Sequence, residues 1–268
     1  MDLESFNTSR ESLVPLLALN NKSNKNIIIF PTDKEAIEFS TDFSNLNKNI
    51  FHLPSWDTLS YDSFVPSFDI QGKRLEIAHL LLTNNNYNIA TSIKAISQRI
   101  YFEELEICKI ELNEEIDFDS LIENLIHLKY QRKDRVESKG SFAIRGGQLD
   151  VYPINYDLPL RVIFDGDLVN EIKTFDTISQ RSVSEKKDIL IVPATELFQI
   201  KHSDILNLSS DKKEILDDYE LFQYSQNLDL EKCLLDLTSN VSLHIVDKNI
   251  VDNQLKEIID IEKDSFEN

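Results

Sequence analysis

Apolar positions in the first hundred residues follow two spacings in turn, short continuous runs and helical repeats. The run NIIIF at residues 26–30 is apolar and β-branched, and Thr32 and Glu35 directly after it have the spacing of a helix capping box. The same order of strand and then helix recurs between residues 49 and 82 and again between residues 87 and 105. Repeated strand–helix units predict a parallel sheet with flanking helices.

Beyond residue 105 the pattern becomes that of an antiparallel unit. The segment FDSLIENLIHLKY, residues 118–130, has helical spacing, and three short strand-like stretches follow it between residues 141 and 176. The triplet Asp165-Gly166-Asp167 between two of these stretches is typical of a hairpin turn. The apolar run at residues 188–198, DILIVPATELF, returns to the style of the first part, so we expect the first domain to resume there.

These patterns together predict an α/β fold in which an antiparallel α+β domain is inserted into a parallel-sheet domain. The predicted boundaries are 1–110 for the first part of the parallel domain, 111–186 for the insert, and 187–268 for the return to the first domain and an acidic, mostly helical C-terminal part.

Three of the five glycines lie close together beside or within the strand-like stretch SFAIRGGQLDVYP, residues 141–153. They are Gly140, Gly146 and Gly147. A strand interior normally avoids glycine, which is used where the backbone takes a positive φ or passes close to another group. The cluster therefore predicts a bulge or a recognition surface around Arg145.

Composition narrows the classes of function. The 28 Lys and Arg residues against 47 Asp and Glu give a net charge of −19, so the protein as a whole should be repelled by nucleic acids and anionic membranes. Cys108 and Cys233 have no metal-like spacing, no run of 18 apolar residues occurs, and the first residues do not resemble a signal peptide. We expect a soluble, cytoplasmic protein without membrane contacts.

The sequence contains no pattern that predicts an active site. No glycine precedes Gly72, so the first strand cannot be followed by the glycine-rich loop that binds phosphates. The five histidines show no zinc-site spacing, and no nucleophile motif is present. We therefore expect no catalytic residue, no cofactor and no metal.

Basic residues are concentrated between residues 129 and 145. The patch consists of Lys129, Arg132, Lys133, Arg135, Lys139 and Arg145, interrupted only by Asp134 and Glu137. Arg161 follows on the next predicted strand, where antiparallel pairing would place it on the same sheet as Arg145. Two interpretations stay open: the arginines contact a partner, or they pair with local acids and keep the strand edge soluble.

The residues of this region are similar to a known family. The stretch YQRKDRVESKGSFAIRGGQLDVYPINYDLPLRVIFDGDLVNEIKTFD, residues 130–176, resembles the insert shared by the excision-repair protein UvrB and the transcription-repair coupling factors (Mfd). Residues 53–75 and 175–183 resemble Mfd and not UvrB. The resemblance covers residues 26–198, and it implies that the first domain is a degenerate P-loop-NTPase-like fold similar to UvrB domain 1.

The resemblance also implies a function. The N-terminal module of Mfd recruits UvrA to RNA polymerase that is stalled at a lesion, in nucleotide excision repair. The translocase motor and the polymerase-binding domain have no counterpart in these 268 residues, so contacts with RNA polymerase and DNA belong to domains outside this chain. The chain is thus expected to be an N-terminal piece or a short relative that recruits UvrA and is not itself an enzyme.

The resemblance assigns the partner-binding residues one by one. Arg145 and Arg161 match the arginines that bind UvrA, and Gly146 and Gly147 would let the strand bend so that Arg145 meets a partner carboxylate in a bidentate contact. Phe164 matches the first aromatic residue of an exposed pair. The second aromatic is replaced here by Asp165, which removes apolar contact area and adds a negative charge beside the arginines.

Two other classes of function compete with recruitment. The basic patch from Lys129 to Arg145 could bind DNA directly, which would give a steep salt dependence of affinity. An ATP-dependent enzyme of the UvrB kind is the third possibility, against which the missing phosphate-binding loop and motor motifs argue.

Overall fold

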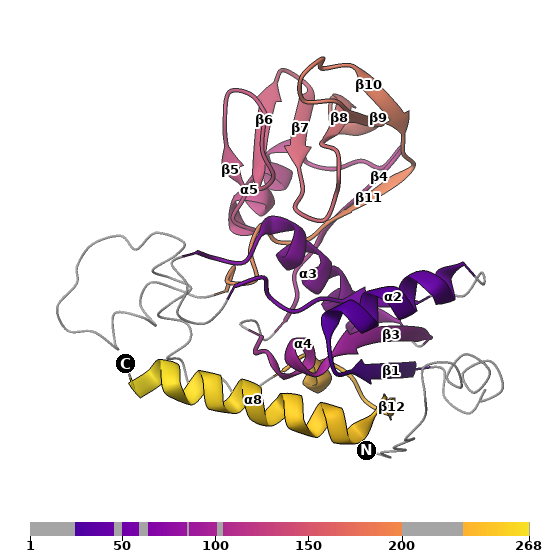
Figure 1. Ribbon diagram of the computed structural model, residues 1–268. Coiled ribbons are helices and arrows are strands. Elements are labelled where there is room, and N and C mark those ends of the chain that lie inside the picture. The colour runs from indigo at the N-terminus through magenta and orange to yellow at the C-terminus, as the bar shows by residue number, and fades with distance from the viewer. Residues whose placement is uncertain are drawn as a thin grey trace. The chain divides into compact units, whose positions relative to one another are not determined.

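The computed structural model describes residues 25–45, 50–58, 64–84, 86–100, 104–199 and 233–267, and the side chains up to residue 261 (Figure 1). The chain divides into two compact units. The first consists of Met1–Pro66, Ile77–Ile100 and Asp211–Asn268, and the second of Ser67–Glu76 and Tyr101–Ser210.

The first unit is built on a four-stranded sheet in the order β12-β1-β3-β2, in which every pairing is parallel. Its strands are β1 (Lys25–Phe30), β2 (Phe51–Leu53), β3 (Tyr87–Ser92) and β12 (Ser242–Ile245). The apolar run of β1 is buried from residue 27 onward, as expected for a central strand covered on both faces. The predicted parallel sheet with flanking helices is confirmed.

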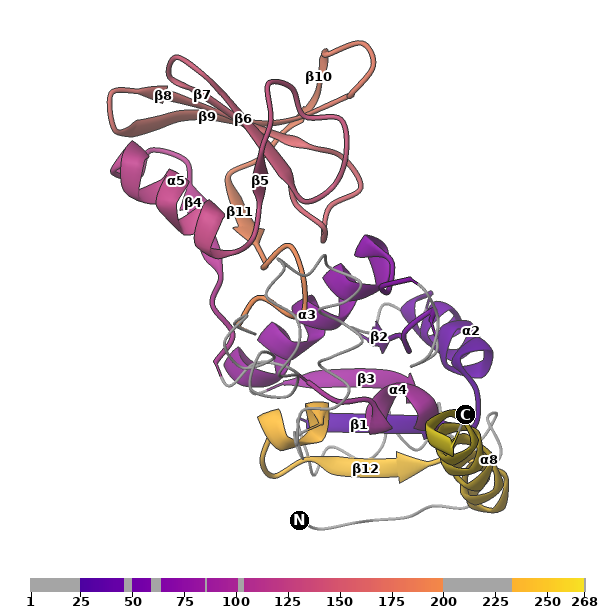
Figure 2. The same ribbon diagram turned by 90° about the vertical axis from the view of Figure 1, so that its left-hand side faces the viewer.

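Helices accompany this sheet (Figure 2). They are α2 (Asp33–Ser44), α4 (Ile93–Ser97), α8 (Lys248–Glu267) and the 3-10 turn η1 (Leu234–Leu237). The helix α3 (Phe68–Thr83) belongs to this unit only from Ile77 onward, because its residues up to Glu76 are part of the second unit. The capping box forms as predicted, with Thr32 accepting from the Glu35 N–H and the Glu35 carboxylate accepting from the Thr32 N–H. Phe39 of α2 packs against Phe30 of β1 at a ring-centroid distance of 5.1 Å.

The helix expected over residues 93–105 is much shorter in the structure. α4 ends at Ser97, and the next residue, Gln98, has extended backbone and accepts a hydrogen bond from the Trp56 N–H through its side chain. Arg99 then forms a β-bridge with Cys233. Contacts with segments distant in sequence thus end a helix that the local spacing favours.

The second unit contains a six-stranded sheet in the order β10-β9-β8-β7-β6-β5. Its strands are β5 (Gln131–Arg132), β6 (Ser141–Arg145), β7 (Gln148–Tyr152), β8 (Leu160–Asp165), β9 (Leu168–Phe175) and β10 (Ser182–Glu185). All pairings are antiparallel except that of β5 with β6. The separate, inserted antiparallel domain is confirmed, and the turn at Gly166 has the positive φ of +62° that glycine adopts without strain.

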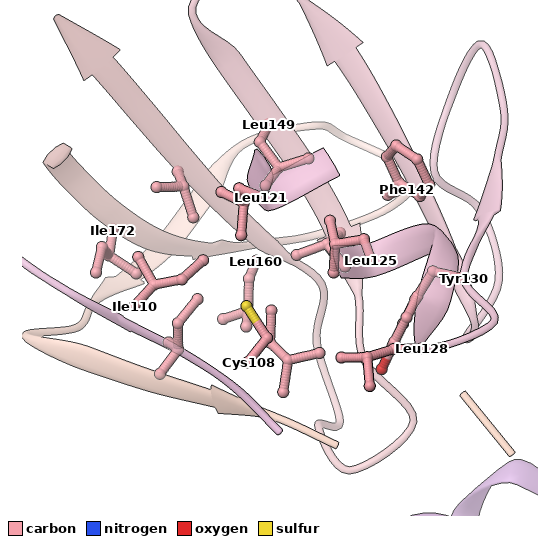
Figure 3. Packing of buried hydrophobic residues seen from close by; sticks show 14 of the residues in the cluster. Cys108, Ile110, Leu121, Leu125, Leu128, Tyr130, Phe142, Leu149, Leu160 and Ile172 are labelled. Carbon is pink, nitrogen blue, oxygen red and sulfur yellow. The ribbon is translucent and has the colours of Figure 1, made fainter. Parts of the chain in front are cut away.

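One face of this sheet packs against α5 (Phe118–His127), which supplies Leu121 and Leu125 to the core (Figure 3). The strands contribute apolar side chains that alternate with polar ones facing the other side, as the period of a strand requires. Buried strand residues of this core are Phe142, Leu149, Val151, Leu160, Val162, Phe164, Val169 and Ile172.

The segment at residues 188–198 differs from the expected return to the first domain. Its strand β11 (Asp188–Ile191) pairs antiparallel with β4 (Cys108–Glu111), and both strands belong to the second unit. No helix follows β11 over residues 192–199. A short apolar run predicts a buried strand in any sheet whose faces are covered. The sequence therefore does not indicate which strand β11 pairs with.

The acidic C-terminal part is only partly described. The strand-like VSLHIVD contains β12, and α8 follows it, whereas residues 200–232 lie outside the described residues. None of the helices in the described part of the chain combines the length and apolar character needed to cross a membrane.

Candidate partner-binding face

Gly146 and Gly147 form the turn of a hairpin, which corrects the expected bend within one strand. Arg145 is the last residue of β6 and pairs with Gln148, the first residue of β7. Gly146 has a φ of +61°, and a Cβ on Gly147 would lie 2.9 Å from the carbonyl oxygen of Phe164. Residue 146 therefore requires glycine because of its positive φ, and residue 147 requires it because β8 passes too close for a side chain.

Arg145 and Arg161 lie on the same face of the sheet. Ala143 pairs with Asp150, and Asp150 pairs with Arg161. Paired residues direct their side chains to the same face, and so do residues two positions apart in a strand, which places Arg145 with Ala143. The shared face that antiparallel pairing predicted is present in the structure, opposite the face covered by α5.

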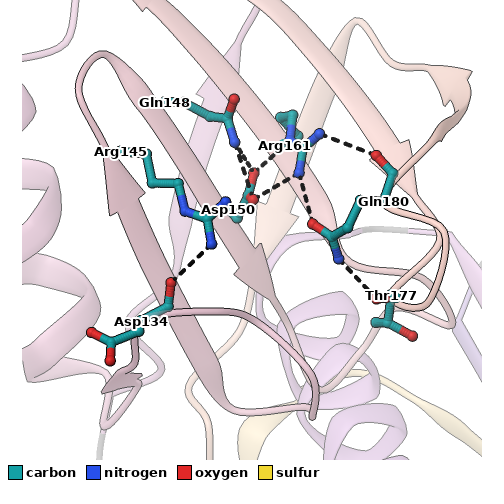
Figure 4. A network of polar contacts seen from close by, with 7 residues as sticks. All are labelled: Asp134, Arg145, Gln148, Asp150, Arg161, Thr177 and Gln180. Atoms are coloured by element: carbon teal, nitrogen blue, oxygen red, sulfur yellow. Dashed lines mark hydrogen bonds and ion pairs between the residues drawn. The ribbon is translucent and has the colours of Figure 1, made fainter.

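Arg161 is engaged within the domain (Figure 4). Its Nε and Nη2 donate to the two carboxylate oxygens of Asp150 at 2.7 and 2.8 Å, which is a bidentate contact. Nη1 donates to the carbonyl oxygen of Gln180 at 3.4 Å, and Nη2 donates to the Gln180 side-chain oxygen at 3.3 Å. The guanidinium also lies over the ring of Phe175, 4.4 Å from its centroid.

These contacts leave Arg161 little capacity for a partner. A guanidinium has five N–H donors, and the contacts with Asp150 and Gln180 use most of them. The hydrogen bonds that Arg161 donates to Asp150 raise the pKa of Arg161, and only 15% of its side chain is exposed. For Arg161, the interpretation that it pairs with a local acid is the one that the structure supports.

Arg145 is in a different situation. Its side chain is exposed, and Nη2 donates to the carbonyl oxygen of Asp134 at 3.2 Å. Within the described part of the chain it forms no ion pair with a carboxylate. Arg145 therefore keeps donors that can meet an acidic group of another molecule.

Two further members of the basic patch are held internally. Lys139 pairs with Asp69 at 2.5 Å and donates to the carbonyl oxygen of Ile154 at 3.0 Å. Arg135 approaches Glu137 at 3.8 Å and donates to the carbonyl oxygen of Thr177 at 2.8 Å. The patch is thus not a uniform basic surface.

Phe164 is buried, so it does not fit the expectation of an exposed aromatic anchor. It is 7% exposed and meets Phe118 edge to face at 4.9 Å between ring centroids, within the core beneath α5. A bulge between Ile163 and Phe164 changes which side chains face inward at this point of β8. Asp165, which follows, is exposed at the end of the strand.

The carboxyl edge of the parallel sheet holds a carboxylate at the N-terminus of α2, a type of position at which a helix can bind phosphate. Asp33, in the first turn of α2, accepts hydrogen bonds from the Ser55 N–H at 3.2 Å, from the Ser55 hydroxyl, and from the Ser92 hydroxyl at 3.0 Å. Among the described residues, no cluster of His, Cys, Asp and Glu side chains could hold a metal ion.

Sequence reasoning missed the residues that organise this face, Asp150 and Gln180. Asp150 has a 7% exposed side chain and also accepts from the Gln148 amide at 3.1 Å. A charged residue in the middle of a strand was the available signal, since such a residue is buried only when it is paired.

Comparison with known proteins places this face in a domain of known type. Residues 108–197, most of the second unit, match the family model described as the UvrB interaction domain. The chain contains a UvrB interaction domain.

The wider chain is homologous to the N-terminal region of transcription-repair-coupling factors. It is 27% identical over 202 residues to the Escherichia coli protein, covering 70% of this chain and 18% of that protein. The Bacillus subtilis protein is 26% identical over 289 residues, which cover 93% of this chain and 24% of that protein. UvrABC system protein B of Thermosipho africanus is more distant, 22% identical over 215 residues, which cover 74% of this chain and 32% of that protein. The chain therefore spans only a minor part of the length of these relatives.

Proposed function

We propose that this chain is the UvrA-recruiting module of a transcription-repair coupling factor, and that it brings UvrA to lesion-stalled RNA polymerase in nucleotide excision repair. The observation that carries the proposal is an exposed arginine, Arg145, on the open face of a domain that matches the UvrB interaction domain. The module acts in the cytoplasm, and RNA polymerase and DNA are contacted by other parts of the intact factor.

The proposal assigns different tasks to the two arginines. Arg145 contacts an acidic group of UvrA, because its guanidinium is exposed and has no carboxylate partner within the described residues. Arg161 has a structural role, because its hydrogen bonds to Asp150 and Gln180 stabilise this face of the sheet. Asp165, exposed at the strand end, takes no part in an apolar contact.

The segment itself performs no catalysis in this proposal. Thr32, Asp33 and Glu35 supply a hydroxyl and two carboxylates to the N-terminus of α2. Negative charge already stabilises this helix end, so an incoming phosphate would meet repulsion where a P-loop would offer backbone N–H groups.

Co-elution of the chain with purified UvrA in size-exclusion chromatography tests the proposal. We expect a complex at low and at moderate salt. Separate elution of the two proteins under both conditions would contradict recruitment. The DNA-binding alternative would be favoured if the chain formed no complex with UvrA but bound duplex DNA with an affinity that falls steeply as salt increases.

A further inference from the structure

The loop between β9 and β10, residues 176–181, is held in one conformation by hydrogen bonds of its own. The N–H and the hydroxyl of Ser179 both donate to one carboxylate oxygen of Asp176 at 2.8 Å. The Gln180 N–H donates to the carbonyl oxygen of Asp176 at 2.8 Å, and the Asp176 N–H donates to the carbonyl oxygen of Arg181 at 3.0 Å. The loop is therefore closed at its base and braced across its middle by an aspartate, as in other turns of this kind.

Two arginines connect this loop to the rest of the second unit. Arg161 donates to the carbonyl oxygen and to the side-chain oxygen of Gln180 (Figure 4). Arg135 donates to the carbonyl oxygen of Thr177 at 2.8 Å, and the Gln180 amide donates to the same oxygen at 2.8 Å. Because Arg161 lies on the open face, the one opposite α5, the loop borders that face.

The loop exposes an apolar side chain. Ile178 is 88% exposed, the highest value of any large apolar side chain that the structure describes, and Val183 in the neighbouring β10 is 59% exposed. Turns favour Gly, Pro, Asn, Asp and Ser, and a β-branched residue has no local advantage there. A residue that disagrees with the local chemistry of its element is expected at a functional position.

An exposed apolar group is what the arginine contact needs beside it. Protein interfaces combine a buried anchor with polar contacts around it, and the anchor contributes most of the affinity. Phe164 cannot serve, because it lies in the core beneath α5, and Asp165 carries a charge. Ile178 has the exposure that an anchor requires before binding.

We propose that Ile178 is the apolar anchor of the contact with UvrA, which it enters by inserting into an apolar pocket of that protein while Arg145 meets an acidic group. The inference rests on the proposed function and adds to it a residue that determines affinity. The strand that carries Arg145, β6, and the strand that leads into the loop, β9, are three strand spacings apart, or about 14 Å. An interface of ordinary size, about 800 Å² on each partner, spans both residues.

The preformed loop strengthens this anchor. A side chain on a flexible loop loses conformational freedom when it binds, whereas the hydrogen bonds of Asp176 fix the backbone around Ile178 beforehand. We expect Asp176→Ala, which leaves Ile178 in place, to weaken binding of UvrA about threefold with an unchanged circular dichroism spectrum. Affinity equal to that of the parent would overturn the part played by the preformed loop.

Titration calorimetry against UvrA tests the anchor with the full chain. The parent is compared with Ile178→Ser and with the matched control Ile126→Ser, whose isoleucine is 55% exposed on α5, the helix that covers the opposite face of the sheet. We expect Ile178→Ser to weaken binding at least about tenfold, because an isoleucine that becomes buried contributes that much, and Ile126→Ser to change it less than about twofold. Neither exposed side chain supports the core, so both variants should unfold at the temperature of the parent.

Two further readouts identify the contact as apolar. Ile178→Leu keeps an apolar side chain of the same size and should bind within about threefold of the parent. The factor lost in Ile178→Ser should be the same at low and at high salt, since salt screens charges and leaves apolar contacts in place. A loss that disappears at high salt, or a Leu variant as weak as the Ser variant, would overturn the apolar anchor.

The outcomes separate this inference from the proposed function. If the parent binds UvrA and Ile178→Ser binds it equally well, or if Ile126→Ser loses as much as Ile178→Ser, the anchor is overturned and recruitment stands. If the parent does not bind UvrA, recruitment fails and the anchor fails with it. Loss in Ile178→Ser alone, with recovery in Ile178→Leu, supports both.

Discussion

At the scale of single residues, Gly72 shows how a helix can depend on the absence of a side chain. It lies in the part of α3 that belongs to the second unit, and a Cβ there would be 2.5 Å from the carbonyl oxygen of Ile154. That oxygen is backbone and cannot rotate away. The close approach of α3 to the loop after β7 therefore requires glycine.

We expect Gly72→Ala to lower the free energy of unfolding by about 1–3 kcal/mol, as overpacking does. At an unobstructed helical site the same change would be stabilising by about 1 kcal/mol, so the sign of the effect is diagnostic. Chemical denaturation measures it, with Lys73→Ala at the neighbouring exposed position as control. A Gly72→Ala protein as stable as the parent would refute the close approach.

Cys108 lies in the core of the second unit and should be chemically inert. It is 4% exposed, and burial, with a smaller effect of Glu114, raises the pKa of its thiol to about 11. The thiolate is the reactive form, so the thiol should not react with a disulfide reagent at pH 8 until the protein unfolds. The Cys233→Ser variant isolates the signal of Cys108, and full labelling of that native variant would show that this core is open.

At the scale of structural elements, Asp150 of β7 and Arg161 of β8 are paired across the two strands and joined by a bidentate contact. We expect Asp150→Ala to cost roughly 3 kcal/mol of unfolding free energy, because it leaves a partly buried guanidinium without its carboxylate. The double variant Asp150→Ala/Arg161→Met removes both charges and should recover most of the loss, relative to the single variants Asp150→Ala and Arg161→Met. Denaturation of the two single variants and the double variant measures this coupling, and a double variant that loses the sum of both single effects would argue against it.

The elements that the sequence predicted correctly are those set by local rules. The capping box at Thr32 and Glu35 and the hairpin turn at Gly166 need only near neighbours in sequence, and both formed as expected. The α5 helix has its apolar residues at helical spacing and is also present. Interactions between residues close in sequence are sufficient to form the capping box, the turn and the helix.

The features that were missed depend on strand register. Phe164 is buried because a bulge shifts the facing of β8, and Asp150 meets Arg161 because β7 and β8 pair at these positions. The partner of β11 is β4, some 80 residues earlier in the chain by the alignment of Asp188 with Glu111, and the local pattern carries no information about such a pairing. The shared sheet face of Arg145 and Arg161 was therefore predicted correctly, while the contacts of the residues on it required the structure.

At the scale of the whole molecule, the first unit is a parallel sheet with flanking helices that carries a carboxylate, Asp33, in the first turn of the helix after β1. We expect MgATP to leave the unfolding temperature unchanged and to undergo no hydrolysis by the pure chain. The reason is the carboxylate of Asp33, which Ser55 and Ser92 hold at the carboxyl edge of the sheet. A thermal shift that saturates with ATP concentration would contradict this expectation, since a ligand that binds the folded state raises its stability.

The negative charge of the whole chain gives the few unpaired cations their significance. A protein with a net charge of −19 binds an acidic partner only where a local cation is exposed, and Arg145 is such a cation in the UvrB interaction domain. The account therefore depends on one direct contact, between this guanidinium and UvrA.

The most direct test is titration calorimetry of the chain with UvrA, comparing the parent, Arg145→Ala and the control Arg181→Ala, an exposed arginine beside the opposite edge of the sheet. The account predicts saturable binding by the parent and by Arg181→Ala, and a loss of about 1.4 kcal/mol or more, which is tenfold in affinity, for Arg145→Ala. Equal affinity of all three proteins would contradict the assignment of Arg145, and no binding by the parent would contradict recruitment itself.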